Sequence, residues 1–171
     1  MPIKKRSKEG INEYSEQITP EYKQHRPIQK TVVLHAPRSR VWRALTDSAQ
    51  FGEWFGTRVE APFVPGQRSR GPITMPEYAH LTFEVDIEQM EPERLFSWRW
   101  QPGGDPQIDP AEPMTLVVFE LEEVPEGTRL TVTETGFDRI PAARRGKAYR
   151  ENDEGWTGQM KSLRQYLART A

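Results

Sequence analysis

The chain has 171 residues, which is the length of one ordinary domain and leaves little room for separate catalytic and regulatory domains. Its 24 Lys and Arg residues nearly balance its 25 Asp and Glu residues, which disfavours both a disordered chain and a basic nucleic-acid-binding protein. Because the sequence contains no cysteine, disulfides, thiolate nucleophiles and cysteine-ligated metal centres are excluded. No apolar run approaches the roughly 18 residues of a membrane span, so we expect a cytoplasmic protein without one.

Residues 1–27 form a charged N-terminal extension whose strongly apolar residues are only Ile3, Ile11 and Ile18. A segment so poor in apolar side chains contributes little to a hydrophobic core, and we expect it to lie outside the domain. The composition changes at Ile28, so the sequence predicts a single domain over residues 28–171.

Two short helices are predicted after a first strand at residues 28–36, which are rich in β-branched side chains. Pro37 then opens a segment with apolar residues at helical spacing. Ser48 is a candidate cap for the second helix. The apolar face of that helix would consist of Phe51, Trp54 and Phe55.

Two alternating segments predict strands in the middle of the chain. Residues 56–78 are interrupted by prolines and glycines and predict only short strands or irregular connections. Within residues 80–90, apolar residues then occupy every second position from Leu81 to Ile87, which is the pattern of a strand with one buried face. After a turn at residues 91–93, the apolar face of the next strand would consist of Phe96, Trp98 and Trp100.

A hairpin is predicted next, after a loop at residues 102–113 that is rich in proline, glycine and aspartate. The turn at residues 125–127 joins one alternating strand to a second at residues 128–136. The apolar face of the first strand would consist of Val117, Phe119 and Leu121.

The period changes to helical beyond Phe137, and the sequence predicts a long amphipathic helix over residues 151–168. Its apolar stripe would consist of Tyr149, Trp156, Met160, Leu163 and Leu167. The order of elements therefore predicts an α+β fold, in which an antiparallel sheet has one exposed face and packs a helix on the other.

Five short motifs occur in this order: VWRALT at 41–46, EWFG at 53–56, GTRLTV at 127–132, GF at 136–137 and GW at 155–156. With them, residues 28–169 resemble the heat-shock protein 90 ATPase activator homologue group of the START-like (SRPBCC) superfamily. The resemblance implies a helix-grip (START/Bet v-like) fold: a curved antiparallel β-sheet wrapped around a long C-terminal α-helix, with an apolar cavity between them. Superfamily members bind lipids, polyketides and other hydrophobic molecules, some are enzymes, and the namesakes of the group are co-chaperones.

Glu134 is the most informative single residue. The alternation of the last strand places it on the core-facing side with Leu130 and Val132. A carboxylate is costly there unless it is paired or lies in a polar cavity. Two roles fit: contact with a ligand or acid–base chemistry at the cavity, or an ion pair with Arg43 or Arg145.

Asn152 and Asp153 precede Trp156 by about one helical turn and therefore continue its inward stripe. Asn152 can donate and accept hydrogen bonds, which suits the orientation of a ligand near the mouth of the cavity. Either side chain can instead cap the start of the predicted helix.

Aromatic side chains dominate the predicted inner surface. Such a set either closes on itself as a core or lines an apolar pocket with a few polar groups. The resemblance favours the pocket. The candidate ligand-binding residues are Trp54, Phe83, Trp98, Trp100, Phe119, Glu134, Asn152, Trp156 and Met160.

No motif of a catalytic, metal or cofactor site is found. The three histidines have no metal-ligand spacing, and the chain lacks a nucleophile elbow and a phosphate-binding loop, so no metal or cofactor is expected. Two charge runs remain, which are either solvated faces or complementary surfaces for a protein partner or a homodimer. The acidic run is Glu84, Asp86, Glu88, Glu91 and Glu93, and the basic run is Arg139, Arg144, Arg145, Lys147 and Arg150.

The leading functional hypothesis is binding of a hydrophobic or aromatic small molecule between sheet and C-terminal helix. The alternatives are a protein-interaction module of the chaperone ATPase activator type and an enzyme acting on a polyketide-like substrate. The sequence names no substrate and no catalytic motif, and the balanced charge predicts no nucleic-acid partner.

Overall fold

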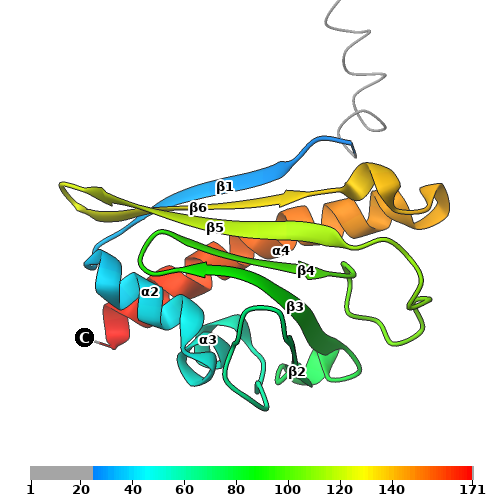
Figure 1. The fold of residues 1–171 in the computed structure, drawn as a ribbon, viewed down its shortest axis with the longest axis horizontal. Coiled ribbons are helices and arrows are strands. Elements are labelled where there is room, and N and C mark those ends of the chain that lie inside the picture. The colour runs from blue at the N-terminus through cyan, green and yellow to red at the C-terminus, as the bar shows by residue number, and fades with distance from the viewer. Residues whose placement is uncertain (1–24, 171) are drawn as a thin grey trace, which may run out of the picture.

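A six-stranded antiparallel sheet curves around one long helix in the computed structural model, which describes residues 25–170 (Figure 1). The strand order is β1-β6-β5-β4-β3-β2. The two short helices follow β1 and lie at one end of the sheet. The strands are β1 (Ile28–Leu34), β2 (Arg68–Pro72), β3 (Thr82–Glu91), β4 (Leu95–Trp100), β5 (Thr115–Val124) and β6 (Gly127–Thr135); the helices are α2 (Arg38–Thr46), α3 (Ser48–Phe55), α4 (Ala142–Arg169) and the 3-10 turns η1 (Pro76–Tyr78) and η2 (Phe137–Arg139).

This architecture confirms the α+β, helix-grip prediction, including the two short helices after the first strand. The domain boundary at residue 28 stays a prediction, because most of the N-terminal extension, residues 1–24, lies outside the described residues.

The hairpin of β5 and β6 is confirmed, and β6 also pairs with β1 along its whole length. The turn depends on Gly127, whose φ of 142° lies in the region that L side chains rarely adopt. A Cβ atom on Gly127 would lie only 2.3 Å from the carbonyl oxygen of Leu34, so glycine also allows β1 and the hairpin to approach closely.

The cap of α3 is Asp47 and not Ser48. The Asp47 side chain accepts hydrogen bonds from the backbone N–H groups of Ala49 and Gln50, at 3.1 and 3.0 Å. Ser48 is the first residue of the helix. The sequence permitted both residues as caps, because serine and aspartate have similar preference for this position.

Helix α4 begins at Ala142, nine residues earlier than the predicted start at Glu151. The prediction followed the apolar stripe, but the first turns of α4 are rich in alanine, arginine and lysine, which favour a helix without forming such a stripe. Asn152 therefore lies well inside the helix, about three turns from its start. The proposed capping role of Asn152 and Asp153 is wrong, because the position before the first turn is Pro141.

Aromatic rings fill most of the space between the sheet and the helices. Phe51 of α3 contacts Phe83 of β3 and Trp98 of β4, with ring centroids 5.3 and 5.7 Å apart. Phe119 of β5 stacks on Phe96 and contacts Trp156 of α4, at 6.0 and 5.6 Å. The core is therefore continuous from α3 across the sheet to α4.

The first residues of β3, before Asp86, do not pair with β4. The paired residues of the two strands run from Glu91 and Leu95 only as far as Asp86 and Arg99. At the start of β3, the backbone N–H of Thr82 donates instead to the carbonyl oxygen of Gly104, at 3.0 Å, from the loop that follows β4. The sheet is therefore incomplete beside Trp100, and a cavity lies at this point.

Candidate functional site

Glu134 lies on the inner face of β6 and is fully buried. Its carboxylate accepts hydrogen bonds from side chains of three further elements, β4, β5 and α4. The donors are Trp100 Nε1 at 2.8 Å, Thr115 Oγ1 at 2.6 Å, Trp156 Nε1 at 2.8 Å and Asn152 Nδ2 at 2.9 and 3.0 Å from the two carboxylate oxygens.

Burial and hydrogen bonding act in opposite directions on Glu134. Removal from water raises the pKa of its carboxyl group, and the hydrogen bonds from Thr115, Trp100, Trp156 and Asn152 lower it. The effect of burial is the larger one, so the pKa of Glu134 is raised above its ordinary value.

The predicted ion pair of Glu134 with Arg43 or Arg145 is wrong. Arg43 is exposed, and Arg145 donates to the backbone carbonyl oxygens of Ile140 and Asp138, both at 3.1 Å. Four uncharged side chains surround the Glu134 carboxylate instead. Sequence reasoning looked for a charged partner and missed the indole N–H groups, although both tryptophans had been placed on the inner surface.

A cavity of about 180 Å³ lies between the incomplete part of the sheet and helix α4. Aromatic and aliphatic side chains form most of its exposed wall, and three carboxamide side chains, one carboxylate, one hydroxyl and three glycines form the rest. The residues that line it are Phe55, Ile73, Leu81, Thr82, Phe83, Glu84, Trp100, Gln101, Gly103, Gly104, Asn152, Gly155, Trp156 and Gln159.

Four of the nine candidate binding residues line this cavity: Phe83, Trp100, Asn152 and Trp156. The other five do not. Glu134 does not line the cavity, but it accepts hydrogen bonds from three of those four side chains, namely Trp100, Asn152 and Trp156. The remaining four do not line the cavity and are buried in the hydrophobic core: Trp54, Trp98, Phe119 and Met160.

Two carboxamide residues of the wall, Gln101 and Gln159, were missed by the sequence reasoning. Gln159 lies seven residues after Asn152 and three residues after Trp156, so helical spacing could have identified it. Gln101 directly follows Trp100 at the end of its strand, where alternation no longer predicts a face. Gly103 and Gly104 belong to a loop whose position no local pattern determines.

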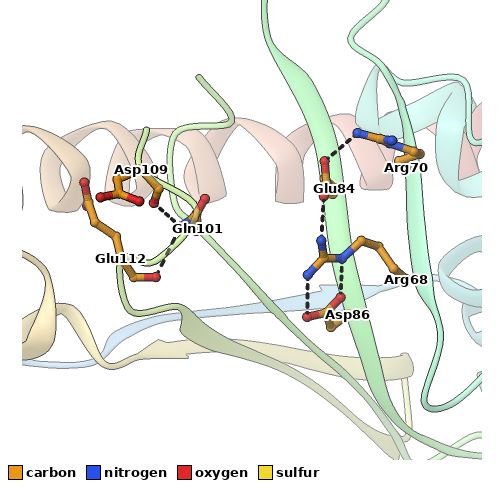
Figure 2. Close-up of polar contacts among 7 residues, drawn as sticks. All are labelled: Arg68, Arg70, Glu84, Asp86, Gln101, Asp109 and Glu112. Atoms are coloured by element: carbon orange, nitrogen blue, oxygen red, sulfur yellow. Dashed lines mark hydrogen bonds and ion pairs between the residues drawn. The ribbon is translucent and has the colours of Figure 1, made fainter. Parts of the chain in front are cut away.

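Glu84 and Asp86 of the acidic run are paired with arginines of β2 (Figure 2). Arg68 of β2 donates to Asp86 at 2.7 Å and to Glu84 at 3.0 Å, and Arg70 donates to Glu84 at 2.9 Å. A second, polar groove of about 280 Å³ lies between these residues and the loop after β4. In the basic run, Arg144 pairs with Glu112 of that loop, at 3.0 Å.

Neither a metal site nor a membrane span is found in the part of the chain that the structure describes. No group of three or more histidine and acidic side chains in residues 25–170 has the geometry of a metal site. No described helix combines the length and the apolar character that crossing a membrane requires.

Solved structures share this fold over most of the chain. Protein MLL2253 from Mesorhizobium loti is 26% identical, with a TM-score of 0.69 over 85% of this chain and 99% of its own. DynU16, from the dynemicin biosynthetic locus, is also 26% identical, with a TM-score of 0.67 over 84% of this chain and 47% of its own, so the chain spans about half of DynU16. The Aha1 dimer from Colwellia psychrerythraea, at 17% identity and a TM-score of 0.62, covers 83% of this chain and 96% of its own and shows the fold alone.

The sheet, the closing helix and these similarities define a helix-grip protein of the START-like (SRPBCC) superfamily. Within it, the chain belongs to the family described as "Activator of Hsp90 ATPase homolog 1-like protein", which matches residues 35–168. A comparison with curated proteins finds no match to this sequence.

Proposed function

We propose that this protein binds a small aromatic molecule in the cavity between β3, β4 and helix α4. The observation that carries the proposal is an apolar cavity whose two tryptophan walls, Trp100 and Trp156, are held by hydrogen bonds to one buried carboxylate. Apolar walls with a few positioned polar groups are typical of small-molecule sites.

The size of the cavity supports a ligand with a single ring. An engineered protein cavity of about 150 Å³ holds benzene, and this one measures about 180 Å³. A benzene ring with one or two small substituents therefore fits, whereas a larger ligand would have to extend outward past Thr82 and Gly104, which also border the polar groove.

Glu134 supports binding by holding the walls in place. Because its oxygens accept five hydrogen bonds and it does not line the cavity, it is a positioning residue for Trp100, Trp156 and Asn152. A buried carboxylate with several donors fixes the orientation of each indole, so the ligand meets walls that are already in their bound arrangement. We therefore propose binding and not acid–base catalysis by Glu134.

Helix α4 offers a matched pair of variants that tests the proposal. Gly155 lines the cavity, Gly158 does not, and a Cβ atom on either residue would meet no atom within 4 Å. Both leucine variants should fold, because glycine inside a helix is less favourable than most residues by about 0.5–1 kcal/mol. The Gly155→Leu variant should lose binding of toluene, as its side chain occupies the cavity, whereas Gly158→Leu should bind as the wild type does.

Binding of toluene can be followed through the five tryptophan indole N–H signals in NMR spectra, of which those of Trp100 and Trp156 should shift. Equal binding by both glycine variants would contradict the proposal. Native mass spectrometry of the purified protein, compared with its denatured mass, would detect a co-purifying ligand and count subunits. The subunit count is of interest because one structurally similar protein is an Aha1 dimer.

The family description supports a second candidate, a protein that stimulates the ATPase activity of a chaperone. This function needs a surface for a protein partner and does not need the cavity. It predicts faster ATP hydrolysis by the chaperone when the protein is added, to the same extent for the wild type and Gly155→Leu. No stimulation at saturating protein would exclude it.

A further inference from the structure

We infer that the ligand of this cavity is a neutral aromatic compound that carries a hydrogen-bond donor, such as a phenol or an arylamine. The inference rests on the proposed function and adds the chemical class of the ligand. It comes from the way in which the three carboxamide side chains of the wall, Asn152, Gln159 and Gln101, are already bonded. Each uses its NH₂ group on an oxygen of the protein, which leaves its carbonyl oxygen for a ligand.

The orientation of Asn152 follows from its partner. Its Nδ2 lies 2.9 and 3.0 Å from the two oxygens of Glu134. Nδ2 therefore donates to both carboxylate oxygens, and Oδ1, on the other side of the planar amide, faces away from Glu134. Oδ1 makes none of the hydrogen bonds found among residues 25–170.

The two glutamines are oriented by backbone carbonyl groups. Gln159 Nε2 donates to the carbonyl oxygen of Phe55 at 2.8 Å. Gln101 Nε2 donates to the carbonyl oxygens of Asp109 and Glu112 at 2.8 and 3.1 Å, as the dashed lines in Figure 2 show. A carbonyl oxygen cannot donate, so in both residues Oε1 is the amide atom that the described protein leaves without a partner.

The other side chains of the wall lead to the same conclusion. The indole N–H groups of Trp100 and Trp156 are already used on Glu134, so neither is available to a ligand. The Glu84 carboxylate is already paired with Arg68 and Arg70, so it offers no cation to an anionic ligand, and the Thr82 hydroxyl can donate or accept. Apart from the Thr82 hydroxyl and the second N–H of Gln159, the polar side chains therefore offer acceptors, and no lysine or arginine lines the cavity to bind a ligand carboxylate or phosphate.

Three probes that share the toluene framework test the inference: p-cresol, which is a phenol, toluene itself, and the anion p-toluate. Affinities can be measured from the shifts of the Trp100 and Trp156 indole signals during titration of the full chain. We expect p-cresol to bind about three- to tenfold more tightly than toluene, which is the effect of one hydrogen bond, and p-toluate to bind most weakly.

The Gln159→Met variant supplies a second measurement. Methionine keeps the length of the side chain and removes the amide, so the preference for p-cresol over toluene should fall toward one. A general disturbance of the wall would lower both affinities and leave their ratio unchanged. Gln165→Met, at an exposed position of the same helix, is the control and should keep the wild-type ratio.

The outcomes separate the two proposals. Equal affinity for p-cresol and toluene, or tightest binding of p-toluate, would overturn the donor-bearing ligand while leaving an aromatic-binding cavity. Unchanged discrimination in Gln159→Met would remove Gln159 from the recognition of the donor. If none of the three probes binds, the proposed function itself fails, and the inference fails with it.

Discussion

The indole Nε1 of Trp156 donates a 2.8 Å hydrogen bond to Oε1 of Glu134 and thereby joins helix α4 to strand β6. The other carboxylate oxygen accepts from Trp100 of β4 and Thr115 of β5. One buried side chain thus connects three neighbouring strands with the helix that the sheet surrounds. The wall of the cavity and the closure of the fold therefore depend on the same group.

Replacement of Trp156 by phenylalanine should destabilise the protein more than the same replacement of Trp98. Both indoles are buried, but Trp98 Nε1 has no hydrogen-bond partner among the described residues, while Trp156 Nε1 bonds to Glu134. The two changes remove the same volume. The difference between their losses of unfolding free energy therefore reports the hydrogen bond to the buried carboxylate, which contributes about 1–3 kcal/mol. Urea unfolding of the two variants measures it, and equal losses would contradict the assigned role of Glu134.

Stability should depend on pH through Glu134. Because folding raises the pKa of this carboxyl group, the folded protein holds the proton more tightly than the unfolded chain. The resulting contribution is complete below the ordinary glutamate pKa of about 4.3 and is lost as the pH rises through the folded value. We expect the free energy of unfolding of the wild type to fall relative to Glu134→Gln as the pH rises above about 4.

The control for this titration is Glu123→Gln, which removes an exposed carboxylate from β5. It accounts for the loss of one negative charge without a change in the core. A wild type that becomes more stable relative to Glu134→Gln as the pH rises would show that the four donors outweigh the cost of burial.

The Gly127→Ala substitution should destabilise the protein far more than Gly66→Ala, although both glycines have positive φ angles, 142° and 81°. A Cβ atom on Gly66 would meet nothing within 4 Å, so only backbone strain of about 1–2 kcal/mol is expected. On Gly127 the Cβ atom would lie 2.3 Å from the carbonyl oxygen of Leu34, so β1 and the turn would have to move apart. Backbone strain and this movement together should lower the free energy of unfolding by about 3 kcal/mol or more. Thermal unfolding compares the two, and similar losses would refute the close approach of β1 to the hairpin.

The loop at residues 102–113 should become more mobile when Arg144 is replaced by methionine. Arg144 donates to Glu112 and to the carbonyl oxygen of Pro102, both at 3.0 Å, and so connects both ends of the loop to α4. Loss of a charge-assisted hydrogen bond of about 1.5 kcal/mol should speed amide exchange in the loop about tenfold.

Hydrogen exchange with mass spectrometry measures this effect. Arg129→Met removes a more exposed ion pair, with Glu122, and serves as the control. Because exposed pairs contribute little, it should change exchange only slightly. Equal exchange of the loop in both variants would show that Arg144 does not hold it. In contrast, faster exchange in Arg144→Met with weaker toluene binding would connect the loop to the cavity.

The sequence predicted the strands and their inner faces because alternation is a local property of the chain. The inward position of Glu134 followed from the same alternation with Leu130 and Val132. Its partners did not, because Trp100, Thr115 and Trp156 come from other elements and are brought to it only by the pairing of β4, β5 and β6 and the packing of α4. The start of α4 was missed because its first turns lack the apolar stripe on which the prediction depended.

The sequence by itself therefore determined the class of fold, the order of its elements and which side chains turn inward, since each depends on neighbours in the chain. Only the tertiary structure decided which inward residues form a closed core and which border a cavity. Trp98 and Trp100 alternate on one strand and share one face, yet the first is enclosed by rings from α3 and β3, and the second lies where β3 and β4 separate. That difference depends on the register of two strands and the path of one loop, which are set by packing across the whole sheet.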